Sequence, residues 1–327
     1  MVVNPGRPVR ERRRQPSGAR LAETTSQDDV DVVTGAFSFT GRAIAELLLV
    51  RGRGVRTLSR TPAPAGSPVE AAPFAFDDPA ALTESLRGSD TLYNTYWIRF
   101  PRGGSSFEGA VENTRTLLRC AADAGVRRFV HVSVSNPSPD SPLPYFRGKA
   151  DVEQAVREAP LVHAIVRPTL IFGPKDILVN NIAWVLRRFP LFVVPGDGSY
   201  RVQPVSVQDT ARLCVDAEPG AELDSAGPET YSFDELVGLI RSAVGGRARI
   251  VHAAPAVALG LARVVGTAIR DVLLTREETL GLMDSLLVSH DPPTGRDSFR
   301  EWLEANAEQL GRRYVSELAR NYRRAPI

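Results

Sequence analysis

A strand, a glycine turn and a helix follow one another directly between residues 30 and 52, and this order constrains the fold more than any other feature of the chain. Val30 to Val33 form a short apolar run typical of a buried strand. After the turn at Gly35, apolar residues recur from Gly41 at helical spacing. The free N–H groups at the start of such a helix can bind a phosphate group. The alternative is a tight connection that binds nothing.

The position of this turn favours a dinucleotide, because it follows the first strand of an alternating series of strands and helices. Gly35 would make the sharp turn, and Gly41 would let the helix approach the strand closely. Ser38 stands where the usual pattern has a third glycine, beside the pyrophosphate. We therefore expect the cofactor to contact Gly35, Phe37, Ser38, Phe39, Thr40 and Gly41.

The alternation of strands and helices continues to about residue 175 and predicts an α/β fold with a doubly wound parallel sheet. We expect residues 29–175 to form the nucleotide-binding domain, with residues 204–217 returning to it. Residues 176–203 and 218–327 should form a smaller, mostly helical region that covers the substrate. Within that region, residues 256–274 are apolar apart from two arginines, and either pack against the nucleotide domain or lie on a membrane surface.

Composition excludes several classes of function. Of the 327 residues, 43% are hydrophobic and 24% are charged, as in ordinary soluble proteins. Residues 1–28 hold six arginines and three acidic residues, so we expect a disordered basic tail, or else a contact for an acidic partner. The rest is nearly neutral, which argues against nucleic-acid binding. The sequence also predicts no membrane span and no metal site, and two core cysteines in a cytoplasmic protein.

The end of the second strand indicates which dinucleotide is bound. An acidic residue here usually binds the ribose hydroxyl of NAD, whereas this chain has Ser59 and Arg60. A guanidinium group suits the 2′-phosphate, so we expect NADP(H) in preference to NAD(H). The alternative is that Arg60 is a solvated surface residue. Asp77, after the third strand, could face the adenine or cap the next helix. Asn94, in the fourth strand, is a further expected cofactor contact.

Tyr145 and Lys149 carry the clearest signal for chemistry. Residues four apart lie on one face of a helix, so the phenol and the ammonium group can reach a common point. The cation would lower the pKa of the phenol and suit it to acid–base catalysis, while the lysine could also hold the nicotinamide ribose. The chain has 38 arginines and only two lysines, so a lysine at this position is unusual. Ser133, in preference to Ser135, would orient the substrate oxygen.

Several motifs resemble those of the extended or atypical short-chain dehydrogenase/reductases. They are TGAFSFTG, HVS, YFRGK, VRPTLIFGP, PGDG and QPVSVQDTA, and they span roughly residues 29–235. Within that superfamily, the chain is most similar to the NAD(P)-dependent epimerase/dehydratase group and to the NAD(P)-binding accessory subunit of respiratory complex I. The resemblance implies a Rossmann fold, a nicotinamide cofactor bordered by Pro168 and Thr169, and Ser133, Tyr145 and Lys149 as catalytic residues. The asparagine of the family's catalytic tetrad aligns near Ala110, with Asn113 close but out of register.

These observations predict an NADP(H)-dependent oxidoreductase or epimerase that acts on a small carbonyl or hydroxyl compound, with a nucleotide sugar as one candidate. The alternative is a binding protein that holds NAD(P)H without turnover and senses redox state or supports an assembly. We expect a monomer or a homodimer. The substrate pocket should include Trp97, Arg99, Arg102 and Asn181, and its arginines suggest an anionic group.

Overall fold

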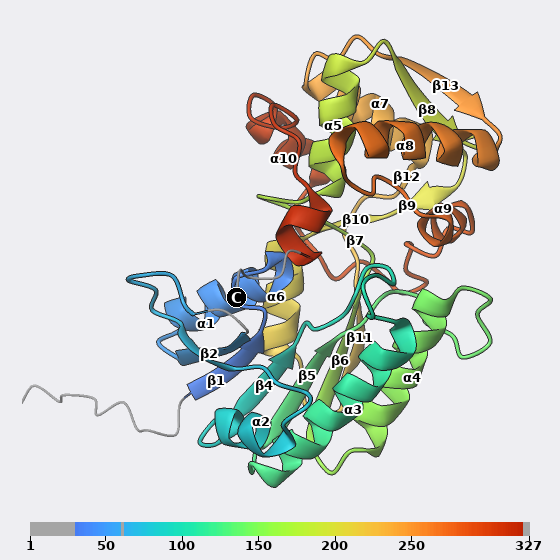
Figure 1. Ribbon diagram of the computed structural model, residues 1–327. Helices are drawn as coiled ribbons and strands as arrows, with labels where there is room; N and C mark the ends of the chain where they lie inside the picture. Colours follow the sequence, from blue (N-terminus) through green and yellow to red (C-terminus); the bar gives the residue numbers. More distant parts are fainter. Residues whose placement is uncertain (1–29, 60–61, 323–327) are drawn as a thin grey trace, which may run out of the picture.

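The centre of the protein is a seven-stranded sheet in the order β11-β6-β5-β4-β1-β2-β3, with every pair of neighbours parallel (Figure 1). A computed structural model describes residues 30–59 and 62–322. The predicted tail at residues 1–28 and Arg60 therefore lie outside the described residues. The strands are β1 (Val30–Thr34), β2 (Gly54–Ser59), β3 (Glu70–Pro73), β4 (Thr91–Asn94), β5 (Arg128–Val132), β6 (Val162–Pro168) and β11 (Glu222–Ser225).

Helices cover both faces of this sheet. One face carries α1 (Phe39–Val50) and α6 (Val207–Asp216), and the other carries α2 (Pro79–Leu86), α3 (Phe107–Asp123) and α4 (Pro144–Glu158). Successive residues of β1 point to opposite faces, so Val32 joins the core under α2, α3 and α4 while Val33 joins the core under α1 and α6. The predicted doubly wound parallel sheet is thus confirmed.

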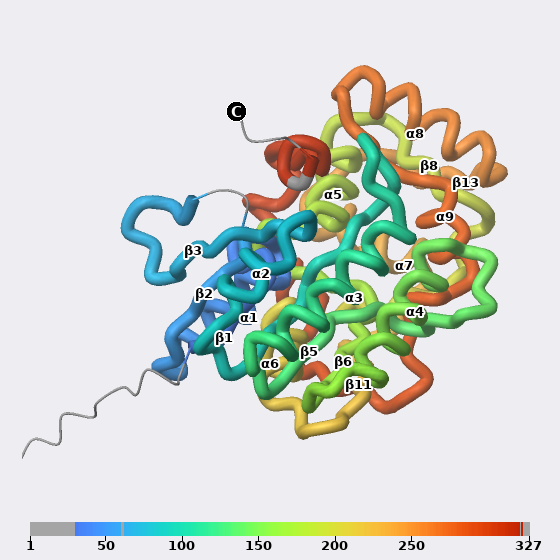
Figure 2. The backbone as a smooth tube through the Cα atoms, turned by 60° about the horizontal axis from the view of Figure 1, so that its bottom comes forward, coloured from blue at the N-terminus to red at the C-terminus, as the bar shows by residue number. Residues whose placement is uncertain are grey.

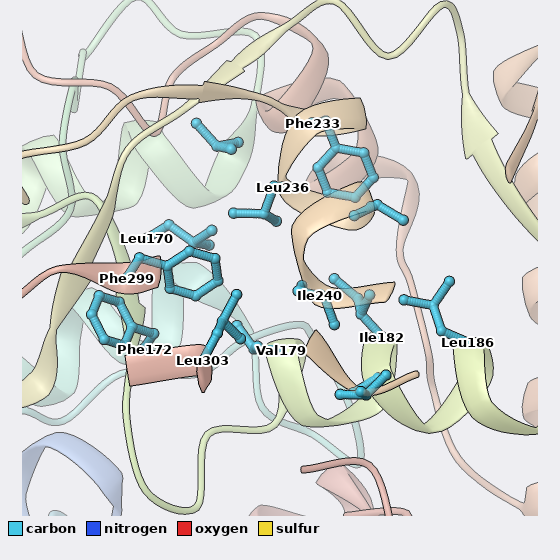
Figure 3. Close-up of a cluster of buried hydrophobic side chains, with 14 of the residues drawn as sticks. Leu170, Phe172, Val179, Ile182, Leu186, Phe233, Leu236, Ile240, Phe299 and Leu303 are labelled. Carbon is cyan, nitrogen blue, oxygen red and sulfur yellow. The ribbon is translucent and has the colours of Figure 1, made fainter. Parts of the chain in front are cut away.

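A second, smaller part of the molecule lies beyond the carboxyl ends of these strands (Figures 1 and 2). It is built around a parallel pair of strands, β8 with β13. Its own hydrophobic core includes Phe172, Leu236 and Phe299 (Figure 3). Its elements are α5 (Leu178–Arg188), β8 (Leu191–Pro195), α7 (Phe233–Ala243), β13 (Arg249–Ala253), α8 (Pro255–Ile269), α9 (Arg276–Met283), α10 (Phe299–Asn306) and a π-helical turn at Leu318–Tyr322.

Two short strand pairs connect the two parts. One is parallel and joins β7 to β10, and the other is antiparallel and joins β9 to β12. The strand expected at residue 205 is β10, which pairs with β7 and not with the main sheet, so β11 is the seventh strand. The strands of these pairs are β7 (Leu170–Phe172), β9 (Arg201–Val202), β10 (Pro204–Ser206) and β12 (Tyr231–Ser232).

Other elements differ from the sequence prediction in extent. The third strand ends at Pro73 and not at Phe76, because Phe74 and Phe76 turn to pack against the ring of Tyr96. The sequence pattern predicts a helix over residues 111–124, whereas α3 begins four residues earlier. There the hydroxyl of Ser106 caps it by accepting a hydrogen bond from Gly109 N.

Helix α8 packs against β8 in the smaller part, and its expected packing on the nucleotide domain was wrong. The helices within residues 30–59 and 62–322 include none with both the length and the apolar character that a membrane span requires. In the same part of the chain, no cluster of three or more histidine, cysteine or acidic side chains could hold a metal ion.

Candidate functional site

The turn between β1 and α1 has the geometry that the sequence predicts. Gly35 has a φ of +69°, in the region that favours glycine. A Cβ atom on Gly41 would lie 2.3 Å from the carbonyl oxygen of Gly35, so only glycine allows this approach of helix to strand. Ser38 precedes the helix, and its hydroxyl donates to Gly35 O at 2.6 Å. Because Ser38 does not cap the helix, the first N–H groups of α1 remain available to a phosphate group.

A cavity of about 1980 Å³ runs from this turn into the smaller part of the molecule. It lies at the carboxyl edge of the parallel sheet, where open α/β sheets bind ligands. Among the expected cofactor contacts, Gly35, Ser38, Phe39, Thr40, Ser59, Asp77 and Tyr145 line it. Phe37, Gly41, Asn94, Lys149, Pro168 and Thr169 do not.

Two of the expected contacts that miss the cavity, Asn94 and Thr169, are buried in hydrogen bonds with the chain itself. Asn94 is completely buried, and its amide nitrogen lies 3.1 Å from His131 Nδ1 while its oxygen accepts from Thr34 and from Tyr96 N. Thr169 donates from its hydroxyl to Gln203 O at 2.6 Å. Of the two roles considered for Asp77, the structure supports the first, because Asp77 lines the cavity and the neighbouring Asp78 caps α2.

Tyr145 lies on the cavity wall among aromatic rings. The rings of Trp97 and Phe107 meet it edge-on, with centroids 6.0 and 5.9 Å away. Burial raises the pKa of Tyr145 to about 12, Glu278 adds to this rise and Arg99 opposes it. The expected lowering of this pKa by Lys149 was therefore wrong, and the phenol holds its proton at neutral pH.

Lys149 is separated from the cavity by the ring of Trp97. Its ammonium nitrogen lies 4.8 Å from the centroid of that ring and donates to Val132 O at 3.0 Å. Only 3% of the residue is exposed. Desolvation lowers the pKa of Lys149 to about 7, although Glu153 opposes the shift. The side chains of Tyr145 and Lys149 thus leave the same helix face but meet different surroundings.

Two serines follow β5, and the structure distinguishes them. The hydroxyl of Ser135 donates to Leu286 O at 2.7 Å, so it has a structural role. The hydroxyl of Ser133 is buried and has no hydrogen-bond partner within the described residues. Trp97 Nε1 and His131 Nε2 are also buried without partners in that part of the chain. Of these three residues only Trp97 lines the cavity, so the hydroxyl of Ser133 and the ring of His131 lie behind its wall.

The residues expected around the substrate have different environments. Trp97, Arg99, Arg102 and Asn181 all line the cavity. The guanidinium group of Arg99, however, is held by Glu278 and by Glu317, whose carboxylate is 3.2 Å away. These carboxylates raise the pKa of Arg99 against the effect of burial. The positive charge of Arg99 is therefore compensated, which leaves Arg102 as the remaining support for an anionic substrate.

The far half of the cavity is apolar. Its lining comes from residues 177–193, from Phe233 and from residues 261–282, where Asn181 and Glu278 are the polar side chains. Lined in this way, it suits an apolar compound better than a sugar. The side chains are those of Ile177, Leu178, Ile182, Val185, Phe189, Leu191, Phe192, Val193, Phe233, Leu261, Val265, Val272, Leu273, Leu274 and Leu282.

Two polar residues on the wall were missed or placed uncertainly from the sequence. Asn113, one turn beyond the aligned Ala110, lines the cavity and donates to the hydroxyl of Tyr96 at 2.9 Å. Arg320, in the π-helical turn, shares the wall with the glycine turn and donates to Lys175 O at 2.7 Å. Arg42 of α1 lowers the pKa of Arg320 by repulsion, after burial as the main cause. No motif marks this C-terminal stretch.

The comparison with known families agrees with this geometry. The pattern of the NAD(P)H-binding family matches residues 35–181. A ketoreductase of Stigmatella aurantiaca, named for a farnesyl-bearing dihydroquinoline oxide, is 31% identical over 238 residues, which cover 63% of this chain and 71% of the ketoreductase. The chain belongs to the NAD(P)H-binding family. It has the NAD(P)H-binding oxidoreductase or epimerase type of fold.

Other relatives in this family are subunits of a respiratory complex. The 40 kDa subunit of mitochondrial NADH-ubiquinone oxidoreductase from Neurospora crassa is 28% identical over 205 residues, which cover 61% of this chain. The match spans only 53% of that subunit. These relatives are named as mitochondrial proteins, which overturns the prediction of a cytoplasmic location. Reduced core cysteines and a lack of long apolar segments do not distinguish one reducing compartment from another.

Solved structures share the fold at low sequence identity. Triphenylmethane reductase of Citrobacter, in complex with NADP(H), has a TM-score of 0.69 at 16% identity, with 85% of this chain and 99% of that chain covered. MoeE5, bound to UDP-glucuronic acid and NAD, has a TM-score of 0.62 at 20% identity, with 84% and 96% covered. The first of these folds holds NADP(H) and the second NAD, so the fold itself does not choose between the two cofactors.

Proposed function

We propose that the protein uses NADPH to reduce a carbonyl group on an apolar small molecule, with Tyr145 as the proton donor. The observation that carries this proposal is the position of Tyr145, whose phenol lines one cavity together with the glycine turn and the apolar wall. In this proposal residues 29–175 and 204–217 hold the cofactor, and residues 176–203 and 218–327 cover the substrate.

The side chains around Tyr145 suit this reaction. When bound, the nicotinamide supplies a hydride to the carbonyl carbon. The Tyr145 phenol, with its pKa raised to about 12, stays protonated at neutral pH and gives its proton to the oxygen as negative charge develops there. The unpartnered hydroxyl of Ser133 would orient that oxygen, and Lys149 would hold or release a proton near neutral pH.

The preference for NADP(H) over NAD(H) is also part of the proposal. Ser59 lines the cavity at the end of β2, where an NAD-binding site usually has an acidic residue. Arg60 would follow it and suit a 2′-phosphate by its charge and planar donors.

The choice of an apolar carbonyl compound is supported by three findings. The far half of the cavity is lined almost entirely by aliphatic and aromatic side chains, and Arg99 has its charge compensated by Glu278 and Glu317. The Stigmatella aurantiaca relative is named as a ketoreductase of a farnesyl-bearing compound. An apolar ketone or a quinone is therefore favoured over a nucleotide sugar.

The test replaces the phenol while keeping its ring. In Tyr145→Phe, we expect NADPH affinity to stay within about twofold and turnover of a responsive apolar ketone or quinone to fall by about 10²- to 10⁴-fold. NADPH fluorescence measures binding, and loss of NADPH absorbance measures turnover. Tyr231→Phe, a change on β12 away from the cavity wall, serves as the matched control. Turnover that survives in Tyr145→Phe would reject the role of the phenol.

A second function is favoured by one specific observation. Trp97 lies over Lys149, so the lysine has no direct route to a ribose in the cavity. A protein that binds NAD(P)H without turnover, as a redox sensor or an assembly subunit, is consistent with that arrangement. Tight NADPH binding with no oxidation across a panel of apolar ketones, quinones and aldehydes would select this function over the reductase.

A further inference from the structure

Helix α8 exposes an apolar face that the fold itself leaves uncovered. Val257, Leu261 and Val264 recur at helical spacing and are 54%, 47% and 68% exposed. Only Ala258 and Gly266 of this helix are buried. Figure 2 shows the helix at the outer edge of the smaller part. A contiguous apolar face of this kind usually marks a site of interaction.

The apolar face continues directly into the cavity. The adjacent side of α8 contributes Ala258, Ala262 and Val265 to the cavity wall. Leu261 belongs to both surfaces, because it is 47% exposed and also lines the cavity. Leu191 of β8 does the same with 49% of its surface exposed. The outer face of α8 and the cavity wall therefore meet at two apolar side chains, Leu261 and Leu191.

The segment that contains α8 carries basic side chains and no acidic ones. Residues 244–270 contain four arginines, at positions 247, 249, 263 and 270, and no acidic residue. All four are exposed, whereas the chain as a whole carries a net charge of only +2. Apolar side chains flanked by arginines are typical of helices that lie at the surface of an anionic bilayer.

We propose that α8 docks on the surface of an anionic lipid bilayer and lets an apolar substrate enter the cavity from the bilayer. The apolar stripe would insert at the boundary between headgroups and acyl chains, and the arginines would contact lipid phosphates. A second copy of the chain fits this face less well, because a symmetric contact would place the same arginines opposite one another. The passage of substrate rests on the proposed reductase function, but the docking does not.

The test measures binding of the NADPH-loaded chain to sedimenting vesicles of phosphatidylcholine, with and without phosphatidylglycerol. We expect binding that increases with the anionic lipid and decreases with salt. The double substitution Leu261→Glu with Val264→Glu should weaken it at least about tenfold. Arg263→Gln should weaken binding to the anionic vesicles only. The matched control is Val50→Glu. Val50 is also exposed, at 85%, but it is the last residue of α1 in the nucleotide-binding part, away from α8.

NADPH titration of every variant checks that the chain is still folded. Absence of vesicle binding by the unchanged chain would overturn the proposal, and so would equal binding by the double variant. A dimer that the double substitution converts to monomers, seen by light scattering with no vesicle binding, would also overturn it in favour of a second copy. Vesicle binding together with no NADPH oxidation in the presence of apolar ketones or quinones would contradict the reductase function but not the docking.

Discussion

Lys149 shows how burial changes the chemistry of one side chain. Its nitrogen lies beneath Trp97, donates to the carbonyl of Val132, and is too deeply buried for water to stabilise its charge. The pKa of Lys149 is consequently lowered from 10.5 to about 7. In the unfolded chain the same amine keeps its ordinary value. Between these two pKa values the unfolded chain binds a proton that the folded chain does not.

This difference predicts a dependence of stability on pH. Because the unfolded state binds the extra proton, the contribution of Lys149 to the free energy of unfolding rises as pH increases from about 7 to about 10. At about 1.4 kcal/mol per pKa unit, the rise is up to about 4 kcal/mol. We expect Lys149→Met to lack this rise in the free energy of unfolding. Urea denaturation should therefore show the unchanged chain gaining stability relative to the variant from pH 7 to pH 10.

The other lysine supplies the control for that measurement. Lys175 is exposed, so Lys175→Met should leave the pH dependence of the unchanged chain as it is. A constant difference between Lys149→Met and the unchanged chain from pH 7 to 10 would show that the amine keeps its charge in the fold.

The residues of the site were only partly predictable. The spacing of Tyr145 and Lys149 located the helix face, because helical geometry depends on local sequence alone. The separation of the two side chains by Trp97 depends on a loop that is distant in the sequence, and no local pattern reveals it. The compensation of Arg99 likewise needs Glu278 and Glu317, which only the folded chain brings near.

At the scale of elements, the contact between α1 and β1 allows no side chain at Gly41. A Cβ atom there would lie 2.3 Å from Gly35 O, which is backbone and cannot move aside. Gly238, in the middle of α7, has nothing within 4 Å of the same position. We expect Gly41→Ala to lower the free energy of unfolding by about 2 kcal/mol or more and to weaken NADPH binding.

The matched substitution in α7, Gly238→Ala, should raise the free energy of unfolding. Gly238→Ala removes backbone freedom from the unfolded chain without any clash, so we expect a gain of about 0.5–1 kcal/mol. Denaturant titration measures the free energy of unfolding of both variants. An unchanged value for Gly41→Ala would mean that α1 can shift away from β1 at little cost.

The central strands and helices were predictable because their apolar patterns and caps are local. The edges of elements were harder to place, since tertiary contacts decide them. Phe74 and Phe76 left the third strand to pack on Tyr96, and β10 paired with β7 and not with the sheet. Helix α8 was expected to be covered, because its sequence is nearly uniform in apolar character and does not indicate which side faces the core.

At the scale of the whole molecule, Arg99 joins three distant segments around the cavity. It lies in the loop after β4, and it contacts Glu278 of α9 and Glu317 near the C-terminal turn. Glu317 has only 5% of its side chain exposed, so it depends strongly on a nearby cation. This network holds the smaller part of the molecule over the nucleotide end of the cavity.

Removal of Arg99 should therefore destabilise the chain through the charges that it leaves behind. We expect Arg99→Gln to lower the free energy of unfolding by about 2 kcal/mol or more, because Glu278 and Glu317 lose their compensating charge. Arg102→Gln, at an exposed position of the same loop, should change it by less than about 0.5 kcal/mol. Denaturant titration measures both variants.

The double substitution identifies the cause of the loss. If the uncompensated carboxylate at Glu278 is responsible, adding Glu278→Gln to Arg99→Gln should restore part of the stability, since one half-buried negative charge disappears. If the loss instead comes from missing contacts of the arginine stem, the second substitution can only add to it. Equal stability of Arg99→Gln and Arg102→Gln would mean that other contacts hold the two parts of the molecule together over the cavity.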